Sequence, residues 1–142
     1  MGHRYPAYRY EVSREKIREY ALATGVTDPA YTDDTDDTAD VVAPPTFAAC
    51  FTVVRGGEAM FADPELGAHP RLVHGGQEFE WHGALRPGDV VECTPWIADI
   101  VARRGNDFVT LQIDCVDAAT GEPVVTSRGT LVFLAPPAEE PS

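Results

Sequence analysis

The chain has 142 residues, which is enough for one hydrophobic core but short for two, so we expect a single domain. Apolar side chains make up 44% of it, and no apolar run reaches the roughly 18 to 20 residues that a membrane-spanning helix needs. The 23 acidic side chains outnumber the 11 basic ones and give a formal net charge of -12, which repels nucleic acid and anionic lipid surfaces. We therefore expect a cytoplasmic protein that binds neither nucleic acid nor membrane.

The cysteines and the acidic residues indicate no metal site. Cys50, Cys93 and Cys115 are odd in number, widely spaced and set in apolar surroundings, which favours buried free thiols over disulfides or a zinc site. Five aspartates fall between residues 33 and 40, but they lack the spacing, the central glycine and the terminal glutamate of a calcium loop. We interpret them as a solvated acidic loop and expect neither a metal nor a cofactor.

The N-terminal part of the chain predicts a strand, a helix and a long loop. Aromatic and apolar side chains alternate with charged ones over residues 8–12, which is typical of a short strand. Ser13 is a good N-cap, so the helix is predicted to begin at Arg14 and to stop at Gly25. Residues 26–42 are polar, acidic and aperiodic, which predicts a mobile loop that borders the functional site.

A second, largely apolar helix is predicted after the sequence Ala-Pro-Pro-Thr at residues 43–46. Thr46 is the expected cap, and the helix should end near Ala62. Because its apolar residues fall on most sides, we expect the helix to be buried. Gly56 and Gly57 each lower helix propensity by about 1 kcal/mol, so this pair is a candidate break.

The rest of the chain predicts strands. Alternating apolar and polar residues between turn signals predict four of them, at residues 73–82, 90–101, 109–115 and 123–134. Pro95 implies a bulge or an edge position in the second of these. The order of elements predicts an α+β fold in which an antiparallel sheet curls around one apolar helix, as in a hotdog domain.

The predicted domain spans residues 1–134, and residues 135–142, rich in Pro and Glu, are predicted to be a disordered tail. A single sheet of this kind leaves edge strands exposed. Pairing of two sheets in a homodimer or a heterodimer covers such edges, so we expect at least a dimer.

Four stretches of the chain carry a family resemblance. Residues 10–21 read Tyr-Glu-Val-Ser-Arg-Glu-Lys-Ile-Arg-Glu-Tyr-Ala, and residues 43–47 read Ala-Pro-Pro-Thr-Phe. His-Gly-Gly-Gln-Glu-Phe-Glu follows at residues 74–80 and Leu-Arg-Pro-Gly-Asp at residues 85–89. Together they resemble the N-terminal domain family of MaoC-like dehydratases, also called FAS1-type dehydratases. Within that family the chain looks most like the accessory subunits of heterodimeric 3-hydroxyacyl-carrier-protein dehydratases.

The resemblance implies a hotdog domain and a hydro-lyase reaction, the reversible loss of water from a (3R)-hydroxyacyl thioester. Active members carry a motif of the form G-D-x-N-P-x-H after the first helix, in which Asp and His act as acid and base. The matching stretch here, residues 25–31, reads Gly-Val-Thr-Asp-Pro-Ala-Tyr. Val26 stands at the Asp position and cannot transfer a proton. Tyr31 stands at the His position, and a tyrosine hydroxyl is a poor base near neutral pH. The resemblance therefore implies a vacant dyad.

Other residues near the expected site are candidates for a role. Asp28 and His74 are weak candidate catalytic groups, because a solvated loop carboxylate and a structural imidazole are the favoured interpretations. Active relatives hold the thioester oxygen with a backbone amide at the start of the buried helix, where proline has none to offer, so the amide of Thr46 or Phe47 is the candidate donor. The candidate substrate-binding residues are Tyr31, Thr46, Phe47, His74, Gly75 and Gln77.

Three functions are compatible with these features. The first is an acyl-thioester-binding subunit that pairs with a catalytic hotdog chain, the acyl group being carried by a carrier protein or by coenzyme A. The second is a homodimeric hydro-lyase, or another conjugate-addition lyase, that uses noncanonical residues. The third is a noncatalytic acyl-thioester binding module. Loss of the dyad favours the first and the third, and the retained outer pattern favours the first.

Overall fold

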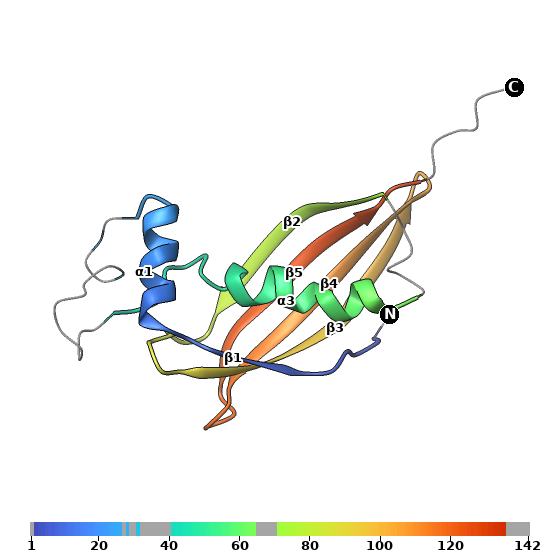
Figure 1. Cartoon of the computed structure of the whole chain (residues 1–142). Coiled ribbons are helices and arrows are strands. Elements are labelled where there is room, and N and C mark those ends of the chain that lie inside the picture. The colour runs from blue at the N-terminus through green and yellow to red at the C-terminus, as the bar shows by residue number, and fades with distance from the viewer. Residues whose placement is uncertain (1, 27, 29–30, 32–40, 65–70, 136–142) are drawn as a thin grey trace, which may run out of the picture.

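The computed structural model describes residues 2–26, 28, 31, 41–64 and 71–135 (Figure 1). Most of the predicted loop over residues 26–42 and nearly all of the predicted tail over residues 135–142 lie outside this part. The described elements are β1 (Tyr8–Glu11), α1 (Arg14–Ala23), α3 (Ala49–Ala62), β2 (Leu72–Trp81), β3 (Val90–Arg103), β4 (Asn106–Asp117) and β5 (Pro123–Phe133). None of the helices described is long and apolar enough to cross a membrane.

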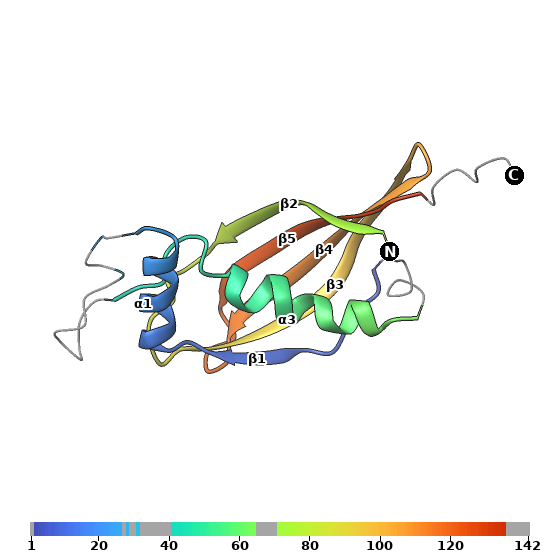
Figure 2. The same ribbon diagram turned by 45° about the horizontal axis from the view of Figure 1, so that its top comes forward.

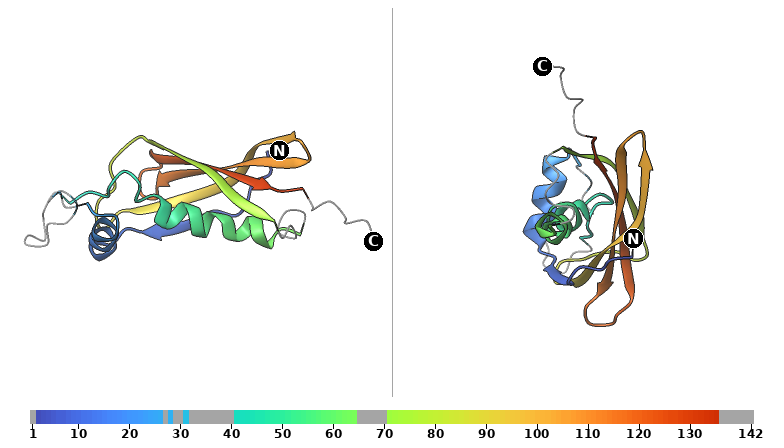
Figure 3. Two further views of the ribbon diagram at one scale, coloured as in Figure 1. Left: turned by 90° about the horizontal axis from the view of Figure 1, so that it is seen from above. Right: turned by 90° about the vertical axis from the view of Figure 1, so that its right-hand side faces the viewer.

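The five strands form one antiparallel sheet in the order β1-β3-β4-β5-β2. The helix α3 lies along one face of this sheet, and α1 lies near one end of it (Figure 2). Seen end-on, α3 stays on the same side of the sheet along its whole length (Figure 3). The predicted α+β arrangement, an antiparallel sheet around one apolar helix, is confirmed, and the four predicted C-terminal strands are all present.

The first helix begins and ends as its sequence predicts. The Ser13 hydroxyl accepts a hydrogen bond from the Lys16 amide at 3.1 Å, which satisfies one of the free amides of the first turn. Ile17 and Ala21 are fully buried against the core. Gly25 adopts a positive φ of 77°, the left-handed conformation that glycine accepts most easily after a helix.

The helix α3 departs from its prediction at two places. It runs without a break through Gly56 and Gly57, so the expected break is wrong. A Cβ atom at Gly56 would collide with Ile113 Cδ1 of β4, which means that glycine here allows the helix to approach the sheet closely. The expected Thr46 cap is also wrong, because the helix begins after Ala48 and no side chain caps it.

Pro95 lies in an interior strand and outside the register shift, which falls between Ile97 and Asp99. Its carbonyl accepts a hydrogen bond from the Tyr5 amide at 2.9 Å. Because the nitrogen and oxygen of one strand residue point to the same side, the missing N–H also faces the N-terminal segment and not β4. The bulge or edge position expected from Pro95 is therefore wrong, and β4 loses no hydrogen bond.

The core between α3 and the sheet contains two of the three cysteines. Cys93 and Cys115 face each other across β3 and β4 and are buried, whereas Cys50 is half-buried. The hydrogen bond with Cys93 and then burial raise the pKa of the Cys115 thiol. Burial likewise raises the pKa of the Tyr8 hydroxyl, which donates to the Phe51 carbonyl. These groups therefore stay protonated at neutral pH.

Candidate functional site

Two hollows lie near the two ends of β2. The first, here called the helix–sheet cavity, lies between α3 and strands β2, β4 and β5 and has a volume of about 30 Å³. The second, here called the loop pocket, has a volume of about 450 Å³ and is lined by Tyr31, Pro45, Trp81 and Leu85 among others. Gln77 of the cavity and Trp81 of the pocket are separated by about 13 Å of strand. The two hollows are therefore distinct sites.

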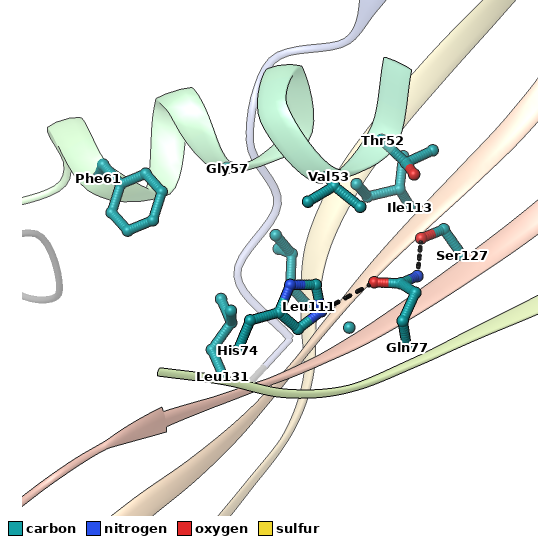
Figure 4. A pocket seen from close by; sticks show the side chains of 11 residues that line it. Thr52, Val53, Gly57, Phe61, His74, Gln77, Leu111, Ile113, Ser127 and Leu131 are labelled. Carbon is teal, nitrogen blue, oxygen red and sulfur yellow. Dashed lines mark hydrogen bonds between the residues drawn. The ribbon is translucent and has the colours of Figure 1, made fainter. Parts of the chain in front are cut away.

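The helix–sheet cavity contains a chain of hydrogen-bonded side chains (Figure 4). His74 Nε2 lies 3.1 Å from Gln77 Oε1, and Gln77 Nε2 donates to Ser127 Oγ at 2.7 Å. Ser127 is only 2% exposed. A Cβ atom at Gly129 would lie 3.0 Å from Gln77 Oε1 and 3.5 Å from His74 Nε2, so the glycine leaves room for both side chains.

The helix–sheet cavity reaches the surface beside α3. Val53 and Phe61 line it and are nevertheless 37% and 50% exposed. The neighbouring strand β2 also exposes Val73, at 47%. Among the strands described, β2 has a neighbour on one side only, which is β5. The cavity is thus bordered by exposed apolar side chains of α3. The edge strand β2 runs next to this helix.

The loop pocket is built by aromatic side chains at the beginning of α3. Trp81 Nε1 donates to the Pro45 carbonyl at 2.7 Å, and Tyr31 lines the same pocket. The Tyr20 hydroxyl lies 2.7 Å from Thr46 Oγ1 and 3.0 Å from its carbonyl oxygen. The Thr46 hydroxyl is thus held by α1, which explains why it does not cap α3.

The two positions that the resemblance assigns to the dyad have different surroundings. The Val26 amide donates to the Ala21 carbonyl at 2.8 Å, which closes the end of α1 in the pattern that usually follows a C-terminal glycine. Val26 is therefore part of a helix terminus. Tyr31 is half-buried, and its amide donates to the Asp28 carbonyl at 3.0 Å. Asp28 itself is exposed.

The six candidate substrate-binding residues do not share one hollow. His74 and Gln77 line the helix–sheet cavity, whereas Tyr31 lines the loop pocket. Phe47 is fully buried in the core, and its amide donates to the Pro44 carbonyl, so that amide is already used.

Gly75 and Thr46 line neither hollow. Gly75 marks the register shift in β2, where a Cβ atom would lie 3.1 Å from Val132 Cγ2.

Two polar residues of the cavity were missed by the sequence analysis. Ser127 occupies an inward position of β5, and Thr52 faces the sheet from α3. A polar residue at the inward phase of an alternating strand is a usable signal for Ser127. Within the part of the chain described, no three His, Cys, Asp or Glu side chains come together as a metal site.

The curled antiparallel sheet around a buried helix defines a hotdog domain, and the comparisons give its family. The chain belongs to the family described as FAS1-like, dehydratase domain region, whose model matches residues 1–127. A UPF0336 protein of Saccharopolyspora erythraea is 41% identical over 138 residues, which cover 93% of this chain and 87% of that protein. A UPF0336 protein of Streptomyces griseus is 44% identical over 141 residues, which cover 95% and 93%.

Solved structures with the same fold include MaoC-like dehydratases and chains of two complexes. The HadBC (3R-hydroxyacyl-ACP dehydratase) complex of Mycobacterium tuberculosis contains a chain that is 27% identical, with a TM-score of 0.71 over 93% of this chain and 94% of that one. A MaoC-like dehydratase is 29% identical, with a TM-score of 0.80 over 94% of this chain and 42% of that one. A chain of the ChsH1-ChsH2 complex of M. tuberculosis, 18% identical with a TM-score of 0.71, covers 96% and 91% and shares the fold.

Proposed function

We propose that this chain is the acyl-thioester-binding subunit of a (3R)-hydroxyacyl thioester dehydratase and that a second hotdog chain supplies the catalytic Asp and His. The observation that carries the proposal is a combination of two features. The resemblance assigns the two dyad positions to Val26 and Tyr31, neither of which is the expected Asp or His. At the same time, a cavity between α3 and the sheet opens beside an edge strand, where a partner subunit would pack.

The surface around β2 supports a partner subunit. The 10 residues of β2 form an edge strand, and an edge of this length pairs readily with another strand. Next to it, α3 exposes Val53 and Phe61. The names of two structural neighbours, HadBC and ChsH1-ChsH2, describe complexes of two chains, which agrees with this arrangement.

Electrostatics favour an unlike partner over a second copy. Each chain has a formal net charge of -12, so two copies would bring equal negative charges together. On β2 itself, Glu78 is exposed, while Glu80 is paired with Arg128 at 3.1 Å. A partner strand with basic side chains would complement Glu78.

The division of labour follows from the chemistry of dehydration. The reaction needs an acid–base pair at the α and β carbons and a donor to the thioester oxygen. Val26 has no ionisable group, so the pair must come from the partner. This chain binds the acyl group, excludes water from it and orients it against the partner's residues.

A second candidate is a stand-alone hydro-lyase that uses His74. The observation in its favour is that His74 lines the helix–sheet cavity and could act on a ligand there. A noncatalytic binding module remains the third reading. The three differ in the activity they predict for the chain without a partner and for the complex.

The test is a hydration assay on an enoyl thioester with the chain alone, the partner alone and the complex of both. The partner is a hotdog chain with the full G-D-x-N-P-x-H motif, sought in a neighbouring reading frame. We expect the complex to exceed this chain alone by about 100-fold or more, because positioned acids and bases contribute that much. Replacing the partner's motif Asp by Asn should abolish the gain. An ordinary enzymatic rate from the chain alone would overturn the subunit proposal in favour of the His74 candidate.

A further inference from the structure

The polar side chains of the helix–sheet cavity have a fixed order of donors and acceptors. Gln77 Nε2 donates to the Glu78 carbonyl at 3.3 Å as well as to Ser127 Oγ at 2.7 Å. A flipped amide would turn its oxygen toward that carbonyl, where two acceptors would repel each other. The amide oxygen therefore faces His74 Nε2, which carries the proton of that hydrogen bond.

This order leaves the Ser127 proton available. A serine hydroxyl has one donor and two acceptor positions, and Ser127 Oγ already accepts from Gln77. Among the described residues, the structure gives the Ser127 proton no acceptor. Because Ser127 is only 2% exposed, bulk water does not reach it freely either. A buried donor of this kind needs a partner.

A hydrogen-bond acceptor that complements the Ser127 donor lies nearby, on α3. Thr52 is 1% exposed, and its hydroxyl donates to the Ala48 carbonyl at 2.7 Å, so the oxygen lone pairs remain to accept. Figure 4 shows Thr52 and Ser127 at the same end of the cavity. Much of the remaining lining is apolar, including Leu111, Ile113 and Leu131. The Ser127 donor and the Thr52 acceptor together match a single hydroxyl group.

We propose that the helix–sheet cavity binds a hydroxyl group at the end of an acyl chain, with Ser127 donating to it and Thr52 accepting from it. The inference rests on the proposed function in taking the ligand to be an acyl thioester. The cavity volume of about 30 Å³ has room for about two water-sized groups, so it takes the tip of a chain and not a longer part. The substrate class is therefore acyl thioesters with an oxygen at the far end.

A plain alkyl end is the less suitable ligand. It fits the apolar lining but leaves the buried Ser127 proton and the buried Thr52 lone pairs without partners. The loss of one such hydrogen bond corresponds to about a tenfold difference in affinity.

The experiment compares matched ligands on matched variants. The probes are saturated acyl-coenzyme A thioesters of increasing chain length, each paired with its terminally hydroxylated counterpart, and binding is measured by calorimetry on the full chain and on its complex with the partner. At one chain length, the wild type should bind the hydroxylated probe about tenfold tighter. Ser127→Ala should reduce that preference, because the hydroxylated probe loses a hydrogen bond and the plain probe no longer leaves the Ser127 proton unpaired.

Two further variants make the result specific. Thr126→Val deletes the neighbouring hydroxyl, which lies 3.1 Å from His82 Nε2 and does not line the cavity, so the preference should stay unchanged. Thr52→Val tests the second contact and should also reduce the preference. It serves as the independent variant if Ser127→Ala does not fold.

Two outcomes would overturn the inference, and they differ in what they mean for the proposed function. If the wild type binds plain and hydroxylated probes equally, or if Ser127→Ala and Thr52→Val keep the preference, acyl-thioester binding stands but the hydroxyl site does not. If no probe binds to the chain or to its complex, the proposed function fails together with the inference.

Discussion

The two hollows near the ends of β2 differ in size, chemistry and scaffold. The helix–sheet cavity is small, and its polar side chains are held by hydrogen bonds between two strands. The loop pocket is larger and apolar, and Tyr31, at one of the two positions that the resemblance assigns to the dyad, lies between α1 and α3 in the sequence. The polar side chains of the helix–sheet cavity are held on the sheet, which positions residues accurately.

Under the proposed function, this difference would allow a subunit to lose catalysis and keep binding. The two positions that the resemblance assigns to the acid–base pair, Val26 and Tyr31, lie at the end of α1 and in the segment after it. The binding residues that we propose, Ser127 and Thr52, lie on β5 and α3, outside that segment. A change in one region therefore need not disturb the other.

The largest expected effect comes from restoring the dyad in the loop region. We expect Val26→Asp and Tyr31→His together to raise the enoyl hydration rate of the isolated chain by about 100-fold, and either change alone to do little, because paired catalytic groups act nonadditively. Stopped-flow or steady-state hydration assays measure this. Glu19→Gln, which changes an exposed carboxylate on α1, is the matched control and should have no effect.

The Val26→Asp substitution should also lower the stability of the chain. Val26 terminates α1, where a carboxylate meets the negative end of the helix dipole and loses about 0.3 to 1 kcal/mol of stability. The thermal unfolding of the double variant should therefore be measured together with its activity. If the double variant is folded and still as slow as the wild type, the region around Val26 and Tyr31 has lost more than the two side chains, and the reading of a simple vacant dyad is wrong.

Local sequence signals predicted the elements well where the cause of the structure is local. Ser13 and Gly25 determine the two ends of α1 by interactions within a few residues, and both ends were predicted. Gly56 was misinterpreted because its role is tertiary. Its low helix propensity is visible in the sequence, whereas the contact with Ile113 depends on how α3 packs against β4.

The distinction between local and tertiary causes also explains which residues of the candidate site were predicted. The family resemblance pointed to His74 and Gln77, but their partner Ser127 is 50 residues beyond Gln77 in the chain. The contact exists because β2 pairs with β5 in one register, in which Gln77 is opposite Gly129. Alternation shows that Ser127 faces inward but not which strand lies beside it. Register between distant strands was thus the missing information.

A smaller effect is expected at the surface beside the helix–sheet cavity. Phe61 is 50% exposed on α3, and replacing it by Asp should weaken association with the partner by about 30-fold, as expected for the loss of an apolar contact of about 2 kcal/mol. Leu22→Asp is the matched control, since Leu22 is 57% exposed on α1 and does not line the helix–sheet cavity. Sedimentation of the mixed chains measures both. Equal effects of the two variants, or none from Phe61→Asp, would remove α3 from the interface.

The smallest expected effect is a difference in stability between the alanine variants of two neighbouring glycines of α3. We expect Gly56→Ala to lower the free energy of unfolding by about 1 to 2 kcal/mol, because the overpacking against buried Ile113 exceeds the gain of about 1 kcal/mol in helix propensity. At Gly57 the nearest atom to a new Cβ is Phe61 Cε2 at 3.0 Å, on a ring that is half exposed and free to turn. Gly57→Ala should therefore be neutral or stabilising.

Urea unfolding of the two alanine variants measures this difference directly, and each serves as the control of the other because both gain the same helix propensity. The contrast depends on the distance between α3 and β4, which also sets the width of the helix–sheet cavity. If Gly56→Ala is as stable as Gly57→Ala, the Ile113 side chain yields easily and the helix is not held close to the sheet. The cavity would then open without cost, and ligands longer than a chain tip would enter it.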